Sequence, residues 1–157
     1  MENKLEKPEK LENVEKKEMW GDRDSTIDEN NGRMSIPAKF RDALDGGFMI
    51  ARHVEKDVRC LRIYTKSAWK SFFDRLKDVR QAEKSKIMRK IGAEHVELDK
   101  QGRFCVPALL REHAFLEGEL LIIGMGDTAE VWSKKEYDKS SADDMNEIAE
   151  ILDKYGI

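Results

Sequence analysis

Two arginine residues, each preceded by glycine, are the most informative candidates for chemistry in this chain. Arg33 ends the run Asn-Asn-Gly-Arg, and Arg103 ends the run Asp-Lys-Gln-Gly-Arg. A guanidinium group can donate two parallel hydrogen bonds to O6 and N7 of guanine, while lysine and backbone amides bind phosphate. A hairpin that carries such groups can enter the major groove of DNA. The candidate DNA-binding residues are Asn31, Gly32, Arg33, Lys100, Gln101, Gly102 and Arg103.

A structural role explains the same arginines at least as well at this point. Acidic residues precede each of them, and a second arginine follows eight positions later. An ion pair within the turn would fix its shape without any contact to nucleic acid, so the spacing leaves both explanations open. The supporting residues of the motif are Asp28, Glu29, Asp99, Arg41 and Arg111.

The common catalytic and metal-binding patterns do not occur in the sequence. His53, His95 and His113 are scattered, with no HxxxH or CxxC spacing. No GxSxG motif, P-loop or dinucleotide-binding glycine pattern occurs either. We therefore predict no catalytic residue, no metal site and no cofactor, and we do not expect an enzyme.

Both arginine loops belong to an internal repeat. Residues 31–42 read NGRMSIPAKFRD, and residues 101–112 read QGRFCVPALLRE. At an offset of 70 residues the glycine, both arginines, the proline and an alanine are identical, and the intervening apolar positions match in character. Such self-similarity indicates two copies of one small structural unit in the same chain.

Each copy predicts the same local structure. Glycine permits the positive φ of a tight turn, and a short apolar strand follows it at 34–36 and 104–106. Proline then ends the strand, because it has no N–H to donate, and suits the first turn of a helix. Short helices are accordingly expected at 38–44 and 108–114.

Further elements are expected around these units. Residues 65–90 predict a helical connector in two pieces, because apolar side chains recur at three- and four-residue spacing. Thr65 and Ser133 suit helix N-caps. Trp20 is expected to anchor the first unit on the core, and residues 142–155 predict a terminal helix. Strands are expected at 48–52, 59–64, 119–124 and 129–132.

Composition gives weaker guidance about partners. Charged residues make up 39% of the chain and the net charge is −3, so composition alone does not favour nucleic acid. Both ends are acidic, which leaves a mild basic excess in the repeat region. Cys60 and Cys105 lie in apolar runs and are expected to be buried free thiols. No segment approaches the roughly 18 apolar residues of a membrane span, so we expect a cytoplasmic protein.

The repeat resembles a known family. The run Asp99-Lys-Gln-Gly-Arg103 followed by VPALLRE closely resembles the DxxxR motif of the MraZ family, bacterial regulators of the division and cell-wall gene cluster. The run TIDENNGRMSIPAKFRDAL looks like a first copy of this motif. The resemblance covers roughly residues 21–140, and the related single-copy units are AbrB/SpoVT-type swapped-hairpin domains.

The resemblance implies a fold and a function. It implies an α+β fold, mainly β with short helices, in which two tandem repeats form a double-split β-barrel. It also implies a ring-like homo-oligomer that binds direct repeats in double-stranded promoter DNA through the loops of Arg33 and Arg103, and hence association with the nucleoid. The expected units are a first repeat (21–70), a helical connector (71–94), a second repeat (95–138) and a C-terminal helix or tail (139–157). The charged extension before them (1–20) lies outside the family pattern and is expected from its composition to be disordered.

The chain departs from the family pattern in its first copy. Asp28 lies five positions before Arg33, whereas Asp99 lies four before Arg103. Either Glu29 takes the acidic role or the loop bulges. The alternative function is a swapped-hairpin protein-interaction module, antitoxin-like or a scaffold, without DNA readout. Two loop arginines favour DNA, because repeated DNA sites require repeated readers.

Overall fold

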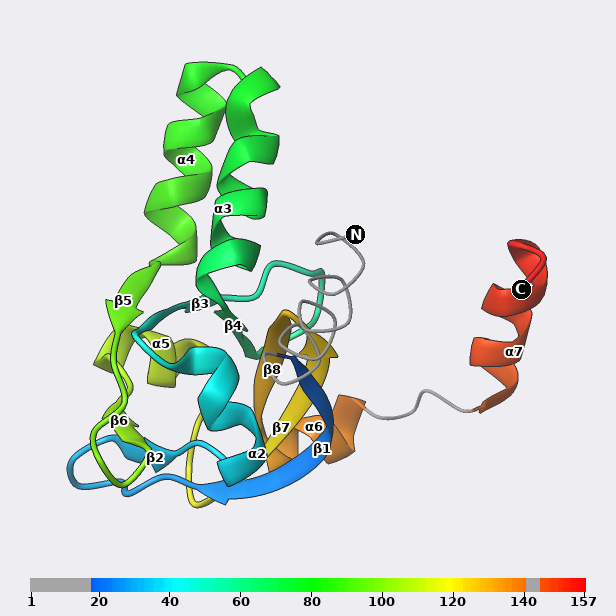
Figure 1. Cartoon of the computed structure of the whole chain (residues 1–157). Coiled ribbons are helices and arrows are strands. Elements are labelled where there is room, and N and C mark those ends of the chain that lie inside the picture. The colour runs from blue at the N-terminus through cyan, green and yellow to red at the C-terminus, as the bar shows by residue number, and fades with distance from the viewer. Residues whose placement is uncertain (1–17, 141–144) are drawn as a thin grey trace, which may run out of the picture.

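The computed structural model describes residues 18–140 and 145–157 (Figure 1). The predicted extension at 1–20 lies almost wholly outside the described residues. The strands are β1 (Met19–Thr26), β2 (Arg33–Ser35), β3 (Phe48–Arg52), β4 (Leu61–Tyr64), β5 (Glu94–Val96), β6 (Arg103–Cys105), β7 (Glu119–Gly126) and β8 (Thr128–Ser133). The helices are α2 (Ala38–Arg41), α3 (Lys66–Arg75), α4 (Gln81–Ile91), α5 (Ala108–His113), α6 (Lys134–Ser140) and α7 (Met145–Lys154), with short 3₁₀ turns η1 (Asp42–Leu44) and η2 (Leu76–Asp78).

The two repeats interleave in one antiparallel sheet. The strand order is β1-β7-β8-β4-β3-β5, and β2 pairs with β6 in a separate two-stranded ribbon. Strands β1 to β4 belong to the first copy and β5 to β8 to the second. Exchanging the copies reverses the strand order and leaves it otherwise unchanged, so a pseudo-twofold axis passes between β4 and β8. The β1·β7, β2·β6, β3·β5 and β4·β8 pairings all join one copy to the other.

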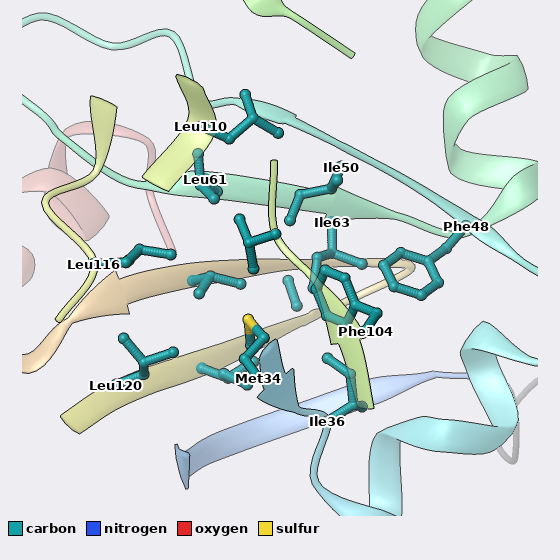
Figure 2. Close-up of a cluster of buried hydrophobic side chains, with 14 of the residues drawn as sticks. Met34, Ile36, Phe48, Ile50, Leu61, Ile63, Phe104, Leu110, Leu116 and Leu120 are labelled. Atoms are coloured by element: carbon teal, nitrogen blue, oxygen red, sulfur yellow. The ribbon is translucent and has the colours of Figure 1, made fainter. Parts of the chain in front are cut away.

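The α+β class is confirmed, but the six-stranded sheet is open and is not closed into the barrel that the resemblance implied. Strands β1 and β5 form its two edges. The ribbon of β2 and β6 packs on the same core as the six-stranded sheet, because Met34 and Phe104 belong to the main cluster of buried side chains (Figure 2). The ring of Phe104 meets that of Phe48 edge-on, with 5.2 Å between ring centroids. Each copy therefore contributes side chains to one shared core.

The connector forms a helical hairpin, α3 and α4, that projects from the sheet beside β3 and β5 (Figure 1). It packs on Ala51 and Tyr64, in a second buried cluster apart from the main core. Thr65 caps α3 as predicted, since its Oγ1 accepts a hydrogen bond from the Ala68 N–H at 3.2 Å. Gly92 ends α4 in the left-handed conformation, with φ of 59°. Trp69 packs against Tyr64 at 5.3 Å between ring centroids, which joins the hairpin to the sheet.

The expectation for Trp20 was wrong. Its side chain is 60% exposed, and Met19 is the fully buried residue instead. Successive side chains of a strand point to opposite faces, so burying Met19 turns Trp20 outward. The indole Nε1 donates a hydrogen bond to Glu18 Oε2 at 2.8 Å.

Candidate nucleic-acid interface

The ribbon of β2 and β6 places the two loop arginines on one outer face. Met34 lies opposite Phe104 in the register, and both side chains are buried. Arg33 directly precedes Met34, and Arg103 directly precedes Phe104. Because side chains alternate along a strand, both arginines point outward, and both are exposed. They line one hollow of about 270 Å³ together with Asp28 and other residues. The fold therefore brings together two arginines that lie 70 positions apart.

The two turns share a backbone pattern despite the extra residue in the first. The Asp99 N–H donates to Arg103 O, and the Gly102 N–H donates to Asp99 O. In the first copy the Asp28 N–H donates to Arg33 O, and the Gly32 N–H donates to Asp28 O. Asp28 thus takes the place of Asp99, and the additional residue bulges between Asp28 and Gly32. Glu29 does not have the acidic role.

In the second copy one side chain accepts the backbone N–H groups of the turn. In the first copy, which has the bulge, two side chains share this role. Asp99 Oδ1 accepts from the backbone N–H groups of Gln101 (2.8 Å) and Arg103 (3.0 Å). In the first copy Asp28 Oδ1 accepts from the Asn30 N–H at 2.8 Å, and Asn31 Oδ1 accepts from the Arg33 N–H at 2.9 Å. Both turns are therefore held by side-chain caps of their backbone N–H groups.

The pKa of Asp99 lies below its ordinary value. The hydrogen bond from the Arg103 backbone is the largest cause, and the bond from Gln101 and the charges of Arg33 and Arg103 act in the same direction. These interactions favour the ionised carboxylate. The carboxylate of the second turn is therefore ionised at neutral pH and lies close to Arg33 and Arg103.

The two loop arginines differ in their partners. Arg33 Nη2 forms an ion pair with Asp99 Oδ2, which joins the first loop to the second. Within residues 18–140 and 145–157, no ion pair involves Arg103. The structural explanation thus applies to Arg33, whose side chain nevertheless remains 43% exposed.

The second arginine of each motif donates a hydrogen bond within its own copy and packs against the loop glycine of the other copy. Arg41 Nε donates to Ile36 O at 2.9 Å, and Arg111 Nε donates to the Val106 O at 3.0 Å. A methyl group on Gly32 would lie 2.7 Å from Cζ of Arg111, and one on Gly102 would collide with the guanidinium of Arg41. Both glycines also have positive φ, +72° and +76°. Glycine is thus required twice over in each loop, by the turn and by the arginine of the other copy.

The outer face of the ribbon includes a residue that the sequence did not predict there. Cys105 is exposed, contrary to the expectation of a buried thiol, and its Sγ donates to Asn31 O at 3.3 Å. Cys60 is buried, and both cysteines are free. Strict alternation with buried Phe104 and Val106 would have placed Cys105 outward, but its apolar neighbours suggested a core position. The exposed residues Asn31, Lys100 and Gln101 complete this side of the two loops.

Two consecutive halves of the chain match one family model. The model, “MraZ protein, putative antitoxin-like”, matches residues 21–90 and again residues 91–152. The chain belongs to the MraZ family. The double match agrees with the two interleaved copies of the fold.

Relatives in the MraZ family resemble this chain over most of its length. The transcriptional regulator MraZ of Caldanaerobacter subterraneus subsp. tengcongensis is 37% identical over 146 residues, covering 88% of this chain and 99% of that protein. The transcriptional regulator MraZ of Alkaliphilus oremlandii is 40% identical over 130 residues, covering 80% of this chain and 89% of that protein. The transcriptional regulator MraZ of Treponema denticola is 37% identical over 147 residues, covering 88% of this chain and 99% of that protein. Among the described residues, none of the helices has the length and apolar character to cross a membrane.

Proposed function

We propose that this MraZ-family chain is a sequence-specific DNA-binding transcriptional regulator. The outer face of the β2·β6 ribbon would read base edges, with Arg33 and Arg103 as the residues that contact guanine. The observation that carries this proposal is the exposure of both arginines on one rigid ribbon. The relatives are themselves named transcriptional regulators, which supports the same conclusion.

The rigidity of the ribbon supports a reading role over a purely electrostatic one. The buried pair Met34 and Phe104 fixes the ribbon on the core, and the guanidinium groups of residues 111 and 41 lie against the loop glycines 32 and 102. Side chains that start from a fixed backbone lose less freedom when they bind, so more of the contact energy is retained. Two bidentate arginines would distinguish guanine from other bases at two positions.

The two copies are proposed to bind unequally. Arg33 must release or share Asp99 before it can reach a base, whereas Arg103 has no ion pair to break among the described residues. The first loop also carries the bulge between Asp28 and Gly32. We therefore assign the stronger base contact to Arg103.

Assembly of several chains would supply the affinity that one near-neutral chain lacks. We propose a ring-like homo-oligomer whose loops meet spaced direct repeats upstream of the division and cell-wall gene cluster, with repression as the outcome and the nucleoid as the location. Binding at several sites of one duplex gains through effective concentration. The apolar side chains of α7, among them Ile151 and Leu152, are exposed and offer a surface for contact between copies.

Fluorescence anisotropy with labelled duplex tests the proposal. Wild type, Arg33→Ala and Arg103→Ala would be titrated with several spaced guanine-rich direct repeats and with a scrambled duplex. Arg80→Ala is the matched control, because its side chain is 81% exposed on the helical hairpin and pairs only with Glu83 among the described residues. Each loop variant is expected to lose about tenfold to a hundredfold in affinity for the repeats, with the larger loss in Arg103→Ala.

The salt dependence is part of the same experiment. Affinity should fall steeply between low and moderate salt, because protein cations release counterions from the phosphates. Equal affinity for repeats and scrambled duplex, with both loop variants like the wild type, would contradict DNA readout. That result would redirect the assignment to a protein partner.

A further inference from the structure

A histidine, a cysteine and a glutamate converge on the sheet face opposite the main core. His53 follows β3, Cys60 precedes β4, and Glu130 lies in β8. Their potential ligand atoms all lie within 4.8 Å of one another. The side chains of His53 and Glu130 are only 9% and 10% exposed, and Cys60 is fully buried. Nitrogen, sulfur and oxygen ligand atoms are thus gathered in one buried place, although the spacing of the three residues in the sequence matches no common metal-binding motif.

The strand register explains how these residues meet. The His53 N–H donates to Cys60 O at 3.0 Å, which extends the pairing of β3 with β4 by one step. Arg62 lies opposite Glu130 across the β4·β8 pairing. Because side chains alternate along a strand, Cys60 and Arg62 share a face, and Glu130 faces the same side from β8. The cluster therefore joins the first copy to the second next to the pseudo-twofold axis.

The cluster has no counterpart on the symmetry-related side. Arg62 and Glu130 occupy equivalent positions of the two copies, and Thr128 occupies the position equivalent to Cys60. The second copy joins β7 to β8 with a tight turn at Asp127, whereas the first copy inserts a longer loop between β3 and β4. The repeat fold alone therefore does not demand these three residues.

Hydrogen bonds hold the ligand atoms of His53 and Glu130 close to the buried Cys60 thiol. Cys60 is a free thiol and is buried. His53 Nε2 lies 3.8 Å from Glu130 Oε2, too far for a hydrogen bond, and 2.9 Å from Oε1 of Glu55. Trp132 Nε1 donates to Glu130 Oε1 at 2.9 Å, and Arg62 Nη2 donates to Glu130 Oε2 at 3.5 Å, so both oxygens of the carboxylate are held in place.

We propose that this cluster binds one Zn²⁺ ion through His53 Nε2, Cys60 Sγ and Glu130 Oε2, with Glu55 as the fourth ligand. Zinc in proteins takes nitrogen, sulfur and oxygen ligands in tetrahedral arrangement at about 2.0–2.3 Å. The ligand atoms of such a site lie about 3–4 Å from one another. The atoms of His53, Cys60 and Glu130 now lie within 4.8 Å of one another, so binding of the ion would draw them closer together.

The charges around the cluster balance when the ion is bound. A Cys60 thiolate and the carboxylates of Glu55 and Glu130 carry three negative charges, and the ion together with Arg62 supplies three positive ones. Arg62 Nη2 lies 3.5 Å from Glu130 Oε2, close enough to contribute to this balance. A buried site that is neutral overall avoids the large cost of burying net charge.

Metal titration of the full chain tests the site independently of DNA binding. Protein treated with a chelator would be titrated with Zn²⁺ against a chromophoric chelator, and separately with Co²⁺. We expect one tight ion per chain and, with Co²⁺, the absorption of a cobalt–thiolate bond. Cys60→Ser should abolish the thiolate absorption and weaken Zn²⁺ binding by at least about tenfold.

Matched controls distinguish this site from adventitious binding. Cys105→Ser removes the other, exposed cysteine, and His95→Gln removes an exposed histidine. Both should bind Zn²⁺ like the wild type. Zn²⁺ should also raise the melting temperature of the wild type and of Cys105→Ser but not of Cys60→Ser, since a ligand of the native state stabilises it.

Several outcomes would overturn the proposal. Equal Zn²⁺ affinity in Cys60→Ser and Cys105→Ser would exclude the cluster as the site. Absence of cobalt–thiolate absorption in the wild type would also exclude the cluster as the site. This measurement needs no variant, so it remains valid even if Cys60→Ser fails to fold. Glu130→Gln provides a further variant, expected to weaken binding while keeping the shape of the side chain.

Discussion

Arg33 of the first repeat forms an ion pair with Asp99 of the second, and this pair joins the two candidate DNA-binding loops. Asp99 at the same time accepts the backbone N–H groups of its own turn. One carboxylate therefore orders the second loop and restrains the arginine of the first. The reciprocal arrangement does not occur among the described ion pairs, since Asp28 has no such contact with Arg103.

Replacing Asp99 by asparagine should strengthen DNA binding. The amide oxygen can still accept the backbone hydrogen bonds of the turn, but the negative charge that holds Arg33 and repels phosphate is removed. We expect higher affinity in anisotropy titrations and a steeper dependence on salt. Asp78→Asn, an exposed aspartate in η2, is the control and should change neither quantity. Weaker binding of a folded Asp99→Asn protein would instead mean that Asp99 presents Arg33 to the DNA.

Gly32→Ala should destabilise the protein by about 1–3 kcal/mol, because alanine is strained at positive φ. The added methyl group also meets the Arg111 guanidinium, so the double variant with Arg111→Ala should lose less than the sum of the two single changes. Chemical denaturation measures these free energies of unfolding. Gly118→Ala is the control, because Gly118 has a φ of +54° and a methyl group added there would have nothing within 4 Å. Equal losses at positions 32 and 118 would show that the crossing arginine is unimportant.

Alkylation of Cys105 with a bulky maleimide should weaken DNA binding by about tenfold or more, as loss of one arginine–guanine contact would. The thiol is exposed on the same face as Arg33 and contacts the first loop through Asn31. Cys60 should not react in the folded protein, because burial above all, and the nearby charge of Glu130, raise the pKa of its thiol. Mass spectrometry should find one modified site, and Cys105→Ser should make DNA binding insensitive to the reagent. Unchanged binding after complete modification of Cys105 would place the DNA elsewhere.

Stability should fall below neutral pH because of His113. Burial lowers the pKa of His113, and the charges of Arg59 and Arg52 lower it further. The unfolded chain binds the proton with the ordinary pKa of about 6.5, so stability is complete above that value and declines as the pH falls from there toward the folded pKa. Urea denaturation at several pH values measures the decline. His113→Gln should flatten the profile between neutral and mildly acidic pH. A profile that His113→Gln leaves unchanged would assign the decline to other groups.

The sequence determined the local structure of this protein. The repeat predicted two equivalent units, each with a glycine turn, a short strand, a proline and a helix, and all of these are present. The helix cap at Thr65 was also readable, because a cap depends only on residues within one turn of helix. Patterns of this kind persist because neighbouring residues fix backbone conformation and the buried face of each element.

Only the tertiary structure decided which segments meet. Alternation shows that Met34 and Phe104 face inward, but not that they face one another across a ribbon, since any strand with the same pattern could pair there. The contact of Arg111 with Gly32, the ion pair of Arg33 with Asp99 and the exposure of Cys105 all depend on that pairing. The tertiary structure also decided that Asp28, and not Glu29, accepts the backbone hydrogen bond of the first turn. The backbone path of the bulge determines which N–H groups a carboxylate can reach. Sequence spacing gives no access to such contacts, because they join residues that are distant along the chain and are brought together only by the shared core.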